Sequence, residues 1–251
     1  MKLALVTGGA KRIGREIALE LARNGYGVLI HYRTSADDAK QVARQCEVLG
    51  APFAATLYAD LSSPGERVDL IARAREVAPD ELRLLVNSAS AFEYDDPETF
   101  TASNLQLHLA TNFVAPVELT MALHAASSAA TVRAHSIMLL DQKVFNLNTD
   151  YMTYTIAKLA CHSSVRFLAQ CCAPWIRVNG IAPGLTLVSG DMTKEVFSKA
   201  HEVAALGRSS TVNDISSAVL ALDQAQAITG QTIAVDGGQH LLARRRDVAF
   251  D

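Results

Sequence analysis

The chain is short of cysteine and of long apolar runs. It has four cysteines, of which Cys171 and Cys172 are adjacent, and none shows the spacing of a metal-ligand motif. Adjacent cysteines do not build a disulfide framework, so we expect reduced thiols, a cytoplasmic protein and no metal site. The apolar run at the N-terminus ends at Gly8, too early for a signal peptide. No stretch approaches the roughly 20 apolar residues of a membrane span.

The chain also lacks an excess of basic residues, with 23 Lys and Arg against 26 Asp and Glu. The formal net charge is −3, which gives no footprint for nucleic acid or for an anionic membrane. Only Arg244, Arg245 and Arg246 form a concentrated run, and we expect them to lie in a solvated tail. The remaining composition, 49% hydrophobic and 20% charged, is that of a soluble globular protein with a sizeable core.

Short apolar runs alternate with segments of helical period, which indicates βαβ units on a parallel sheet. We predict strands over 3–7, 27–32, 54–59, 82–87, 132–140, 176–181 and 229–235. We predict helices over 13–23, 36–49, 64–77, 103–127, 151–172 and 212–222, and a substrate loop over about 183–199. Residues 1–251 are thus predicted to form a single-domain α/β Rossmann fold, a doubly wound parallel seven-stranded sheet with helices on both faces.

A glycine-containing turn follows the first predicted strand. It runs Thr7-Gly8-Gly9-Ala10-Lys11-Arg12-Ile13-Gly14 and leads into the first helix. Glycines let a backbone approach a pyrophosphate, and a helix N-terminus offers free N–H groups and a positive dipole end. The turn predicts a dinucleotide site. A glycine turn that binds no ligand would have the same sequence pattern and is the alternative.

The end of the second strand indicates which dinucleotide is bound. Tyr32 is followed by Arg33, Thr34 and Ser35, and no acid appears before Asp37. NAD binders place an acid here for the ribose 2′-hydroxyl, whereas NADP binders place an arginine for the 2′-phosphate. Unless Arg33 is only a surface residue, NADPH is the expected cofactor.

Tyr154 and Lys158 stand four residues apart on a predicted helix, with Asp141 thirteen residues before the tyrosine. Positions i and i+4 share a helix face, so the Lys158 ammonium is expected beside the Tyr154 phenol. A nearby cation favours phenolate and lowers the pKa of a tyrosine. The pair predicts an acid–base device, while a solvated helix face is the alternative.

These segments together resemble the short-chain dehydrogenase/reductase family over essentially the whole chain. The resemblance implies that Asp60 and Leu61 contact the adenine and that Asn87, Ala89 and Ser90 support the cofactor. It further implies that Asn112 and Lys158 carry a proton-relay water, that Lys158 holds the nicotinamide ribose, and that Pro183 and Gly184 belong to the cofactor site.

The family usually assembles as a homotetramer through its long helices, here 103–127 and 151–172, and its last strand. Their apolar residues are equally consistent with burial in a monomer.

Three departures from the common family pattern point to one branch. Arg12 replaces a glycine of the turn, Ser90 replaces a glycine after the fourth strand, and Asp141 replaces the usual catalytic serine. In this the chain resembles the pteridine reductases and the bacterial dihydromonapterin reductases. An aspartate suits the N–H groups of a pterin, and Phe92 is expected to stack on that ring, unless it is ordinary core packing. For Arg12 a purely phosphate-binding role is as good an interpretation as contact with both phosphates and substrate.

The sequence therefore predicts NADPH-dependent reduction of a 7,8-dihydropterin to the tetrahydropterin. Hydride is expected at C6, with a proton reaching N5 through water steered by Arg12, and Tyr154 is expected to protonate N8 of fully oxidised pterins. The expected substrate contacts are Arg12, Ser90, Phe92, Asp141 and Tyr154. A general NADP-dependent carbonyl or 3-oxoacyl reductase of the same family is the alternative, and a non-catalytic NADP sensor is a third reading.

Overall fold

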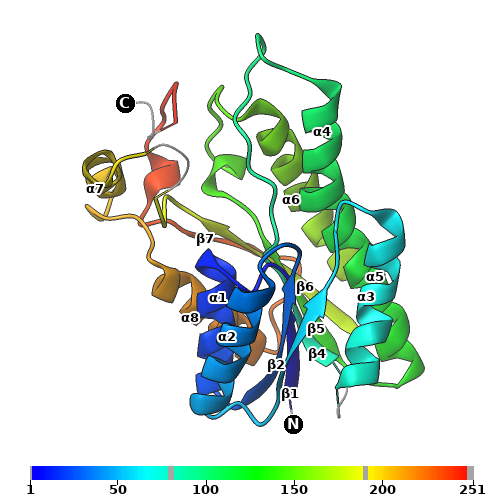
Figure 1. The fold of residues 1–251 in the computed structure, drawn as a ribbon. Helices are drawn as coiled ribbons and strands as arrows, with labels where there is room; N and C mark the ends of the chain where they lie inside the picture. Colours follow the sequence, from blue (N-terminus) through cyan, green and yellow to red (C-terminus); the bar gives the residue numbers. More distant parts are fainter. Residues whose placement is uncertain (1, 79–81, 189–191, 248–251) are drawn as a thin grey trace.

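The structure, a computed structural model, describes residues 2–78, 82–188 and 192–247 and is built on one parallel sheet (Figure 1). Its strand order is β3-β2-β1-β4-β5-β6-β7. The strands are β1 (Lys2–Val6), β2 (Tyr26–Tyr32), β3 (Ala54–Tyr58), β4 (Leu82–Asn87), β5 (Ala134–Leu139), β6 (Ile176–Pro183) and β7 (Thr232–Val235). The α-helices are α1 (Arg12–Arg23), α2 (Ala36–Val48), α3 (Pro64–Val77), α4 (Ala102–Leu109), α5 (Ala115–Ala129), α6 (Met152–Cys171), α7 (Lys194–Glu202) and α8 (Val212–Gln224).

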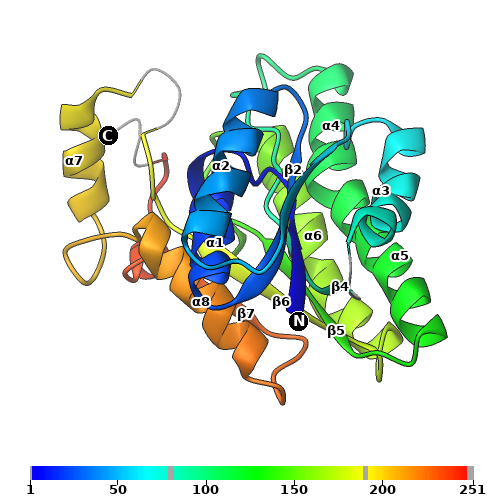
Figure 2. The same cartoon turned by 60° about the horizontal axis from the view of Figure 1, so that its bottom comes forward.

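Helices cover both faces of the sheet, as Figures 1 and 2 show. Successive side chains of a strand point to opposite faces. Leu3 and Leu5 therefore join the core beneath α3, α5 and α6, while Ala4 and Val6 join the core beneath α1, α2 and α8. Burial on both faces explains why the strands read as nearly continuous apolar runs. The predicted doubly wound Rossmann fold is confirmed.

The strand order reverses between β1 and β4, because β2 and β3 continue on one side of β1 and β4 to β7 continue on the other. The β1 strand pairs with β2 from Lys2 to Val6 and with β4 up to Val6↔Val86. The connections after these strands leave the sheet in opposite directions, which opens a crevice at their carboxyl ends. Ligands of open α/β sheets bind at such a switch point.

The long helix predicted over 103–127 is instead broken in the middle. A π-helical segment, η1 (Ala110–Val114), separates α4 from α5 and contains Asn112. Pro116 stands four residues after Asn112 and has no N–H to give to that residue's carbonyl, so regular α-helical bonding cannot continue there. Widened turns of this kind occur often at functional sites. The proline was the sequence signal for this break.

The predicted 183–199 loop is also only partly a loop. Helix α7 begins at Lys194, and its N-cap Thr193 accepts a hydrogen bond from the Val196 N–H. Residues 189–191 of the predicted loop lie outside the described residues. Within the described part of the chain no helix is long and apolar enough to cross a membrane.

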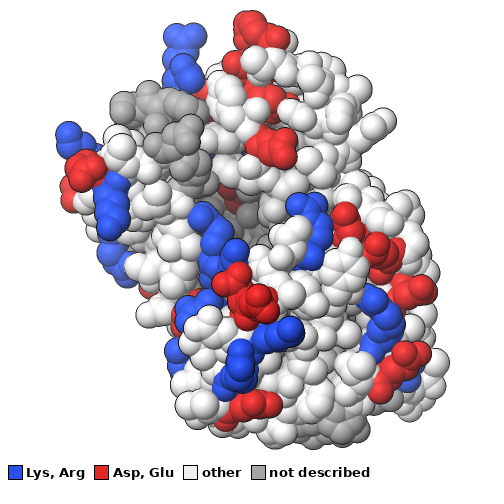
Figure 3. Space-filling view, viewed as in Figure 1, with Lys and Arg blue, Asp and Glu red and all other residues white. Residues whose placement is uncertain are grey.

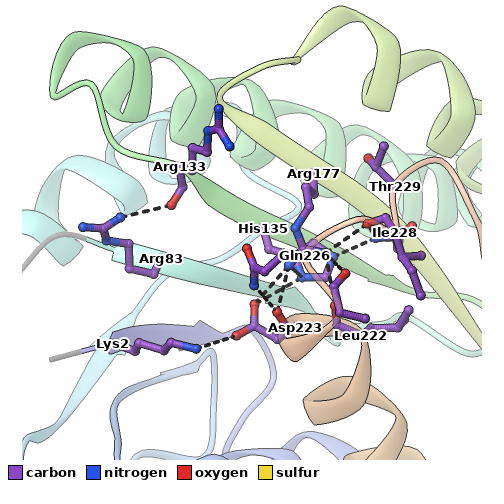
Figure 4. A network of polar contacts seen from close by, with 12 residues as sticks. Lys2, Arg83, Arg133, His135, Arg177, Leu222, Asp223, Gln226, Ile228 and Thr229 are labelled. Atoms are coloured by element: carbon purple, nitrogen blue, oxygen red, sulfur yellow. Dashed lines mark hydrogen bonds and ion pairs between the residues drawn. The ribbon is translucent and has the colours of Figure 1, made fainter.

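A buried polar network joins the sheet to α8 at the amino-terminal ends of the strands (Figure 4). Asp223 accepts a hydrogen bond from the Tyr26 hydroxyl at 2.5 Å and lies 3.3 Å from Nδ1 of His135. Arg177 lies 3.6 Å from the same carboxylate and donates to the carbonyls of Leu222 and Ile228. The network ties β2, β5, β6 and α8 together on the side opposite the crevice.

We expect Asp223→Asn to lower the free energy of unfolding by about 3 kcal/mol, because removing one member of a buried charged network leaves the others uncompensated. Denaturant unfolding measures the change. Asp69→Asn on the exposed side of α3 is the matched control and should stay within about 0.5 kcal/mol of the original chain. Equal effects for the two variants would show that the network contributes nothing to stability.

Candidate active site

A cavity of about 540 Å³ opens at the carboxyl ends of the strands, and Figure 3 shows a hollow near the middle of this face. It is bordered by the turn after β1, the ends of β4 and β5, helix α6 and the segment after β6. The predicted site residues that line it are Gly8, Lys11, Arg12, Ile13, Gly14, Ala89, Ser90, Phe92, Asp141, Tyr154, Lys158, Pro183 and Gly184. The predicted residues outside its lining are Tyr32, Arg33, Thr34, Ser35, Asp60, Leu61, Asn87 and Asn112.

The turn after β1 has room for a backbone but not for side chains at two glycines. Gly8 has a φ of +62°, and a Cβ there would lie 2.9 Å from Cα of Ala89. A Cβ on Gly14 would lie 2.3 Å from the Gly8 carbonyl oxygen. These positions therefore require glycine. The resulting open backbone before α1 is the cradle that a pyrophosphate needs.

Two side chains that the sequence analysis missed hold this turn in place. Thr7 Oγ1 accepts hydrogen bonds from the N–H groups of Ser88 and Ala89, at 2.9 and 3.0 Å. His31 Nδ1 accepts from the Gly8 N–H at 3.0 Å, so its Nε2–H donates to the Ala59 carbonyl. Burial lowers the pKa of His31 to about 4 and keeps the ring neutral. His31 directly precedes Tyr32 in β2 and is buried. Its position in this strand was the available sequence signal for a contact with the turn.

Arg12 lies in the left-handed backbone region, with a φ of +52°. This conformation is disfavoured for a residue with a Cβ and costs roughly 1 kcal/mol or more. It explains why the family's common turn has glycine here. The guanidinium of Arg12 donates to the Val188 carbonyl at 2.9 Å, so it reaches from the phosphate turn to the segment after β6.

The end of β2 carries exposed cations in loose ion pairs. Arg33 has 55% of its side chain exposed and lies 4.0 Å from Asp60, while Lys11 pairs with Asp38 at 3.1 Å. Asp60 is oriented by accepting from the N–H and hydroxyl of Ser62. Exposed ion pairs of this kind are weak, and the two cations therefore stay available to an anion.

The acid–base residues predicted from their spacing come together in the cavity. The Tyr154 hydroxyl donates to Asp141 Oδ2 at 3.0 Å, and Asp141 Oδ1 accepts from the Lys143 N–H at 2.9 Å. Lys158 donates to the Leu139 carbonyl at 2.7 Å and lies 5.6 Å from the centre of the Tyr154 ring. Asp141 thus forms the direct hydrogen bond to the tyrosine that its predicted catalytic role requires.

The predicted lowering of the Tyr154 pKa is wrong for this structure. Burial, followed by the charge and hydrogen bond of Asp141, raises the pKa of Tyr154 well above its ordinary value. Burial also raises the pKa of Asp141 and lowers that of Lys158. The prediction failed because it considered the lysine and not the carboxylate, which forms the direct hydrogen bond. The site holds its tyrosine as a protonated donor.

Protein contacts occupy both polar atoms of the Asn112 side chain but only the nitrogen of Asn87, whose buried Oδ1 has no hydrogen-bond partner among the described residues. Asn112 accepts from the Ala91 N–H at 2.8 Å and donates to the Ala91 carbonyl at 2.9 Å. Asn87 is buried and donates to the Ser136 hydroxyl. The Asn112 side chain therefore positions the segment that leads to Phe92, and its predicted role in a proton relay remains a prediction.

Phe92 lies at the cavity and not in the core, with 41% of its surface exposed. Its ring stacks on Tyr151, with centroids 4.4 Å apart and planes 18° apart, and meets Tyr154 edge-on at 4.7 Å. Tyr151, which sequence analysis missed, precedes α6 with a φ of +56°. The two rings form an aromatic wall beside the acid–base pair.

The last arginine of the tail predicted to be solvated is exposed, with 51% of its side chain in solvent, but it is also anchored to the protein. Arg246 forms an ion pair with the buried Asp150, with Nε at 3.0 Å from both carboxylate oxygens. Asp247 follows it and lines the cavity. The tail folds back because Asp150, buried in the segment before α6, needs a cationic partner.

Arg12→Gly should stabilise the chain without cofactor by about 1 kcal/mol, because glycine adopts a positive φ without strain. The same change should weaken binding of the expected NADPH, since it removes a cation. Denaturant unfolding and fluorescence titration measure the two effects. Arg12→Lys is the control and should keep the strain, so a stabilised lysine variant would contradict this explanation.

Comparisons with known proteins agree with this geometry. The family profile described as enoyl-(acyl carrier protein) reductase matches residues 8–240. The NADPH-dependent aldehyde reductase 2 of Arabidopsis thaliana is 31% identical, over 94% of this chain and 93% of its own length. Pteridine reductase 1 of Leishmania tarentolae is 30% identical, over 95% of this chain and 96% of its own length.

A solved structure is also similar. The FolM alternative dihydrofolate reductase 1 of Brucella canis, complexed with NADP, matches with a TM-score of 0.88 and 34% identity. The match covers 96% of this chain and 95% of that one. These similarities run over nearly the whole sheet and include the turn after β1 and the segment around Tyr154. The chain belongs to the short-chain dehydrogenase/reductase family of oxidoreductases.

Proposed function

We propose that the protein catalyses NADPH-dependent reduction of a 7,8-dihydropterin to the tetrahydropterin. The observation that carries this proposal is the Asp141–Tyr154 hydrogen bond of 3.0 Å inside a cavity that Phe92 also lines. A carboxylate accepts from the ring N–H and amino groups of a pterin, whereas a carbonyl substrate offers it no donor.

The residues present fit NADPH. The open backbone around Gly8 and Gly14 suits the pyrophosphate, because a Cβ at either position would clash with neighbouring backbone. Arg33 at the end of β2 is exposed and suits a 2′-phosphate. Lys158 lies in the cavity with its ammonium at the end of β5, where it suits a ribose hydroxyl. When bound, the nicotinamide supplies the hydride for C6 of the pterin.

The protein's own residues position the substrate and its proton. Phe92 offers a flat apolar face to one side of the ring, and Asp141 accepts its N–H groups. Tyr154 stays protonated because its pKa is raised. Its single O–H donates to Asp141 here and would turn to N8 to protonate a fully oxidised pterin. Arg12 also lines the cavity and is suited to orient the water that protonates N5. Positioned proton transfer contributes about 10²–10⁴-fold.

The names of the similar proteins support this proposal at the level of substrate class. Two of them are named for the reduction of pterins: pteridine reductase 1 of Leishmania tarentolae and the Brucella alternative dihydrofolate reductase. One observation favours a second candidate, a carbonyl reductase, since the Arabidopsis aldehyde reductase is similarly related at 31% identity. The carboxylate at position 141 weighs against it.

We also propose that the protein assembles as a homotetramer. Large apolar side chains are exposed on two of the helices expected to mediate assembly: Met121 on α5 is 43% exposed, and Ile156 and Phe167 on α6 are 42% and 66% exposed. Burying such side chains between subunits would stabilise an assembly. Light scattering of the purified protein tests the subunit number.

A substrate panel tests the proposed reaction. Oxidation of NADPH should be fast with dihydromonapterin or dihydrobiopterin and slow with a simple ketone, and NADH should be a poorer donor because it lacks the phosphate expected at Arg33. Initial rates at fixed cofactor concentration measure both preferences. Faster turnover of the ketone would support the carbonyl reductase, and a preference for NADH would contradict the assignment of Arg33.

Asp141→Ala should reduce kcat/KM for the dihydropterin about 10²-fold or more while NADPH still binds. The same variant should lower the pKa of Tyr154, because the carboxylate that now opposes phenolate is gone. Initial rates measure the first effect, and ultraviolet titration of tyrosinate, with Tyr154→Phe as the blank, measures the second.

Asp69→Ala on the exposed face of α3 is the matched control for Asp141→Ala and should change neither quantity. Unchanged pterin turnover in Asp141→Ala would remove this residue from the mechanism. A Tyr154 pKa that stays fixed would show that burial alone raises it.

A further inference from the structure

The last described residues, up to Asp247, are anchored across the segment between β5 and α6. Arg246 contacts both carboxylate oxygens of Asp150, and the Asp247 N–H donates to Asp150 Oδ2 at 2.7 Å. Earlier in the same tail, the Leu242 carbonyl accepts from Asn146 at 2.9 Å. Asp150 has only 3% of its side chain exposed. Contacts to a buried carboxylate and to backbone groups give the tail a defined position.

This anchoring brings the Asp247 carboxylate into the cavity. Its Oδ2 lies 2.6 Å from Nζ of Lys143, and Lys143 has 3% of its side chain exposed. Lys143 also donates to Asn148 Oδ1 at 2.9 Å, and its N–H donates to Asp141. Asp247, Lys143 and Asp141 all line the cavity. The carboxylate is therefore held by a buried cation next to the acid–base pair.

Charge is distributed unevenly around the cavity. The basic side chains Lys11 and Arg12 belong to the phosphate turn, and in Figure 3 Lys and Arg atoms border the lower side of the hollow while Asp and Glu atoms lie on the lobe above it. Farther along the cavity Asp247 pairs with Lys143, and Asp141 lies near Lys158. Among the described residues that line this part, the two carboxylates thus offset the two lysines.

We propose that Asp247 is a specificity-determining residue that makes the enzyme prefer dihydropterins with uncharged substituents over those that carry carboxylates. This inference rests on the proposed function. Asp247 and Asp141 line the same cavity, so a substituent that leaves the ring towards the Lys143–Asp247 pair passes close to the Asp247 charge. Without this carboxylate, the buried Lys143 would attract an anionic substituent.

The experiment compares kcat/KM for dihydromonapterin, which has an uncharged side chain, with kcat/KM for dihydrofolate, which carries carboxylates. Asp247→Asn should shift the ratio towards dihydrofolate by about tenfold, chiefly through a lower KM for dihydrofolate. Asp247→Glu should keep the original preference because it keeps the charge. Added salt should weaken the preference of the original enzyme and have less effect on Asp247→Asn.

Two further variants distinguish an effect of the Asp247 charge from an effect of the protein's net charge. Glu98→Gln removes one exposed acid from the segment between β4 and α4 and should leave the ratio unchanged. Arg246→Gln removes a positive charge, so a general charge effect would favour the uncharged substrate. Release of the tail would instead withdraw Asp247 and favour dihydrofolate, which is the result expected here. Thermal unfolding confirms that each variant is folded.

The outcomes distinguish this inference from the proposed function. The same substrate ratio in the original enzyme and in Asp247→Asn, with both turning over dihydropterins, overturns the role of Asp247 and leaves the proposed function standing. Failure of the original enzyme to oxidise NADPH with either dihydropterin overturns the proposed function and this inference with it. An equal shift in Glu98→Gln also overturns the inference, because the effect would then be general.

Discussion

The hydrogen bond between the Tyr154 hydroxyl and the Asp141 carboxylate is the interaction on which the site depends. It lies where protein atoms surround both groups, so neither ionises as it would in water. Burial raises the pKa of Tyr154 most, and the charge and hydrogen bond of Asp141 raise it further. The tyrosine therefore keeps its proton and holds it against the carboxylate.

The sheet positions this pair and the cofactor turn relative to one another. Asp141 follows β5 and the turn follows β1, and both reach the same edge because the strands are parallel. Thr7 joins the turn to the end of β4, and His31 joins it to β2 and Ala59. The buried network around Asp223 ties the opposite ends of the strands to α8. The strands that border the crevice are therefore fixed by polar contacts at both their carboxyl and their amino ends.

The site is divided by charge. The phosphate turn contributes cations, including Arg12 in a strained backbone conformation that glycine would relieve, whereas the far end holds Asp141 and the Lys143–Asp247 pair. Backbone strain retained at a functional site is common when the side chain is needed there. The same arrangement suits a negatively charged cofactor beside the phosphate turn and, in the function proposed above, a hydrogen-bond-donating ring beside Asp141.

Local pattern in the sequence determined the parallel sheet, the glycine turn and the spacing of Asp141, Tyr154 and Lys158, because strand burial, turn geometry and helical period act over a few residues. The tertiary structure decided the raised pKa of Tyr154 and the contact of His31 with the turn, whereas Pro116 already marked the break at Asn112 in the sequence. The tertiary structure also decided that Arg246 and Asp247 lie against residues about 100 positions earlier in the chain. These features depend on which buried groups meet across the fold, and no short stretch of sequence carries that information.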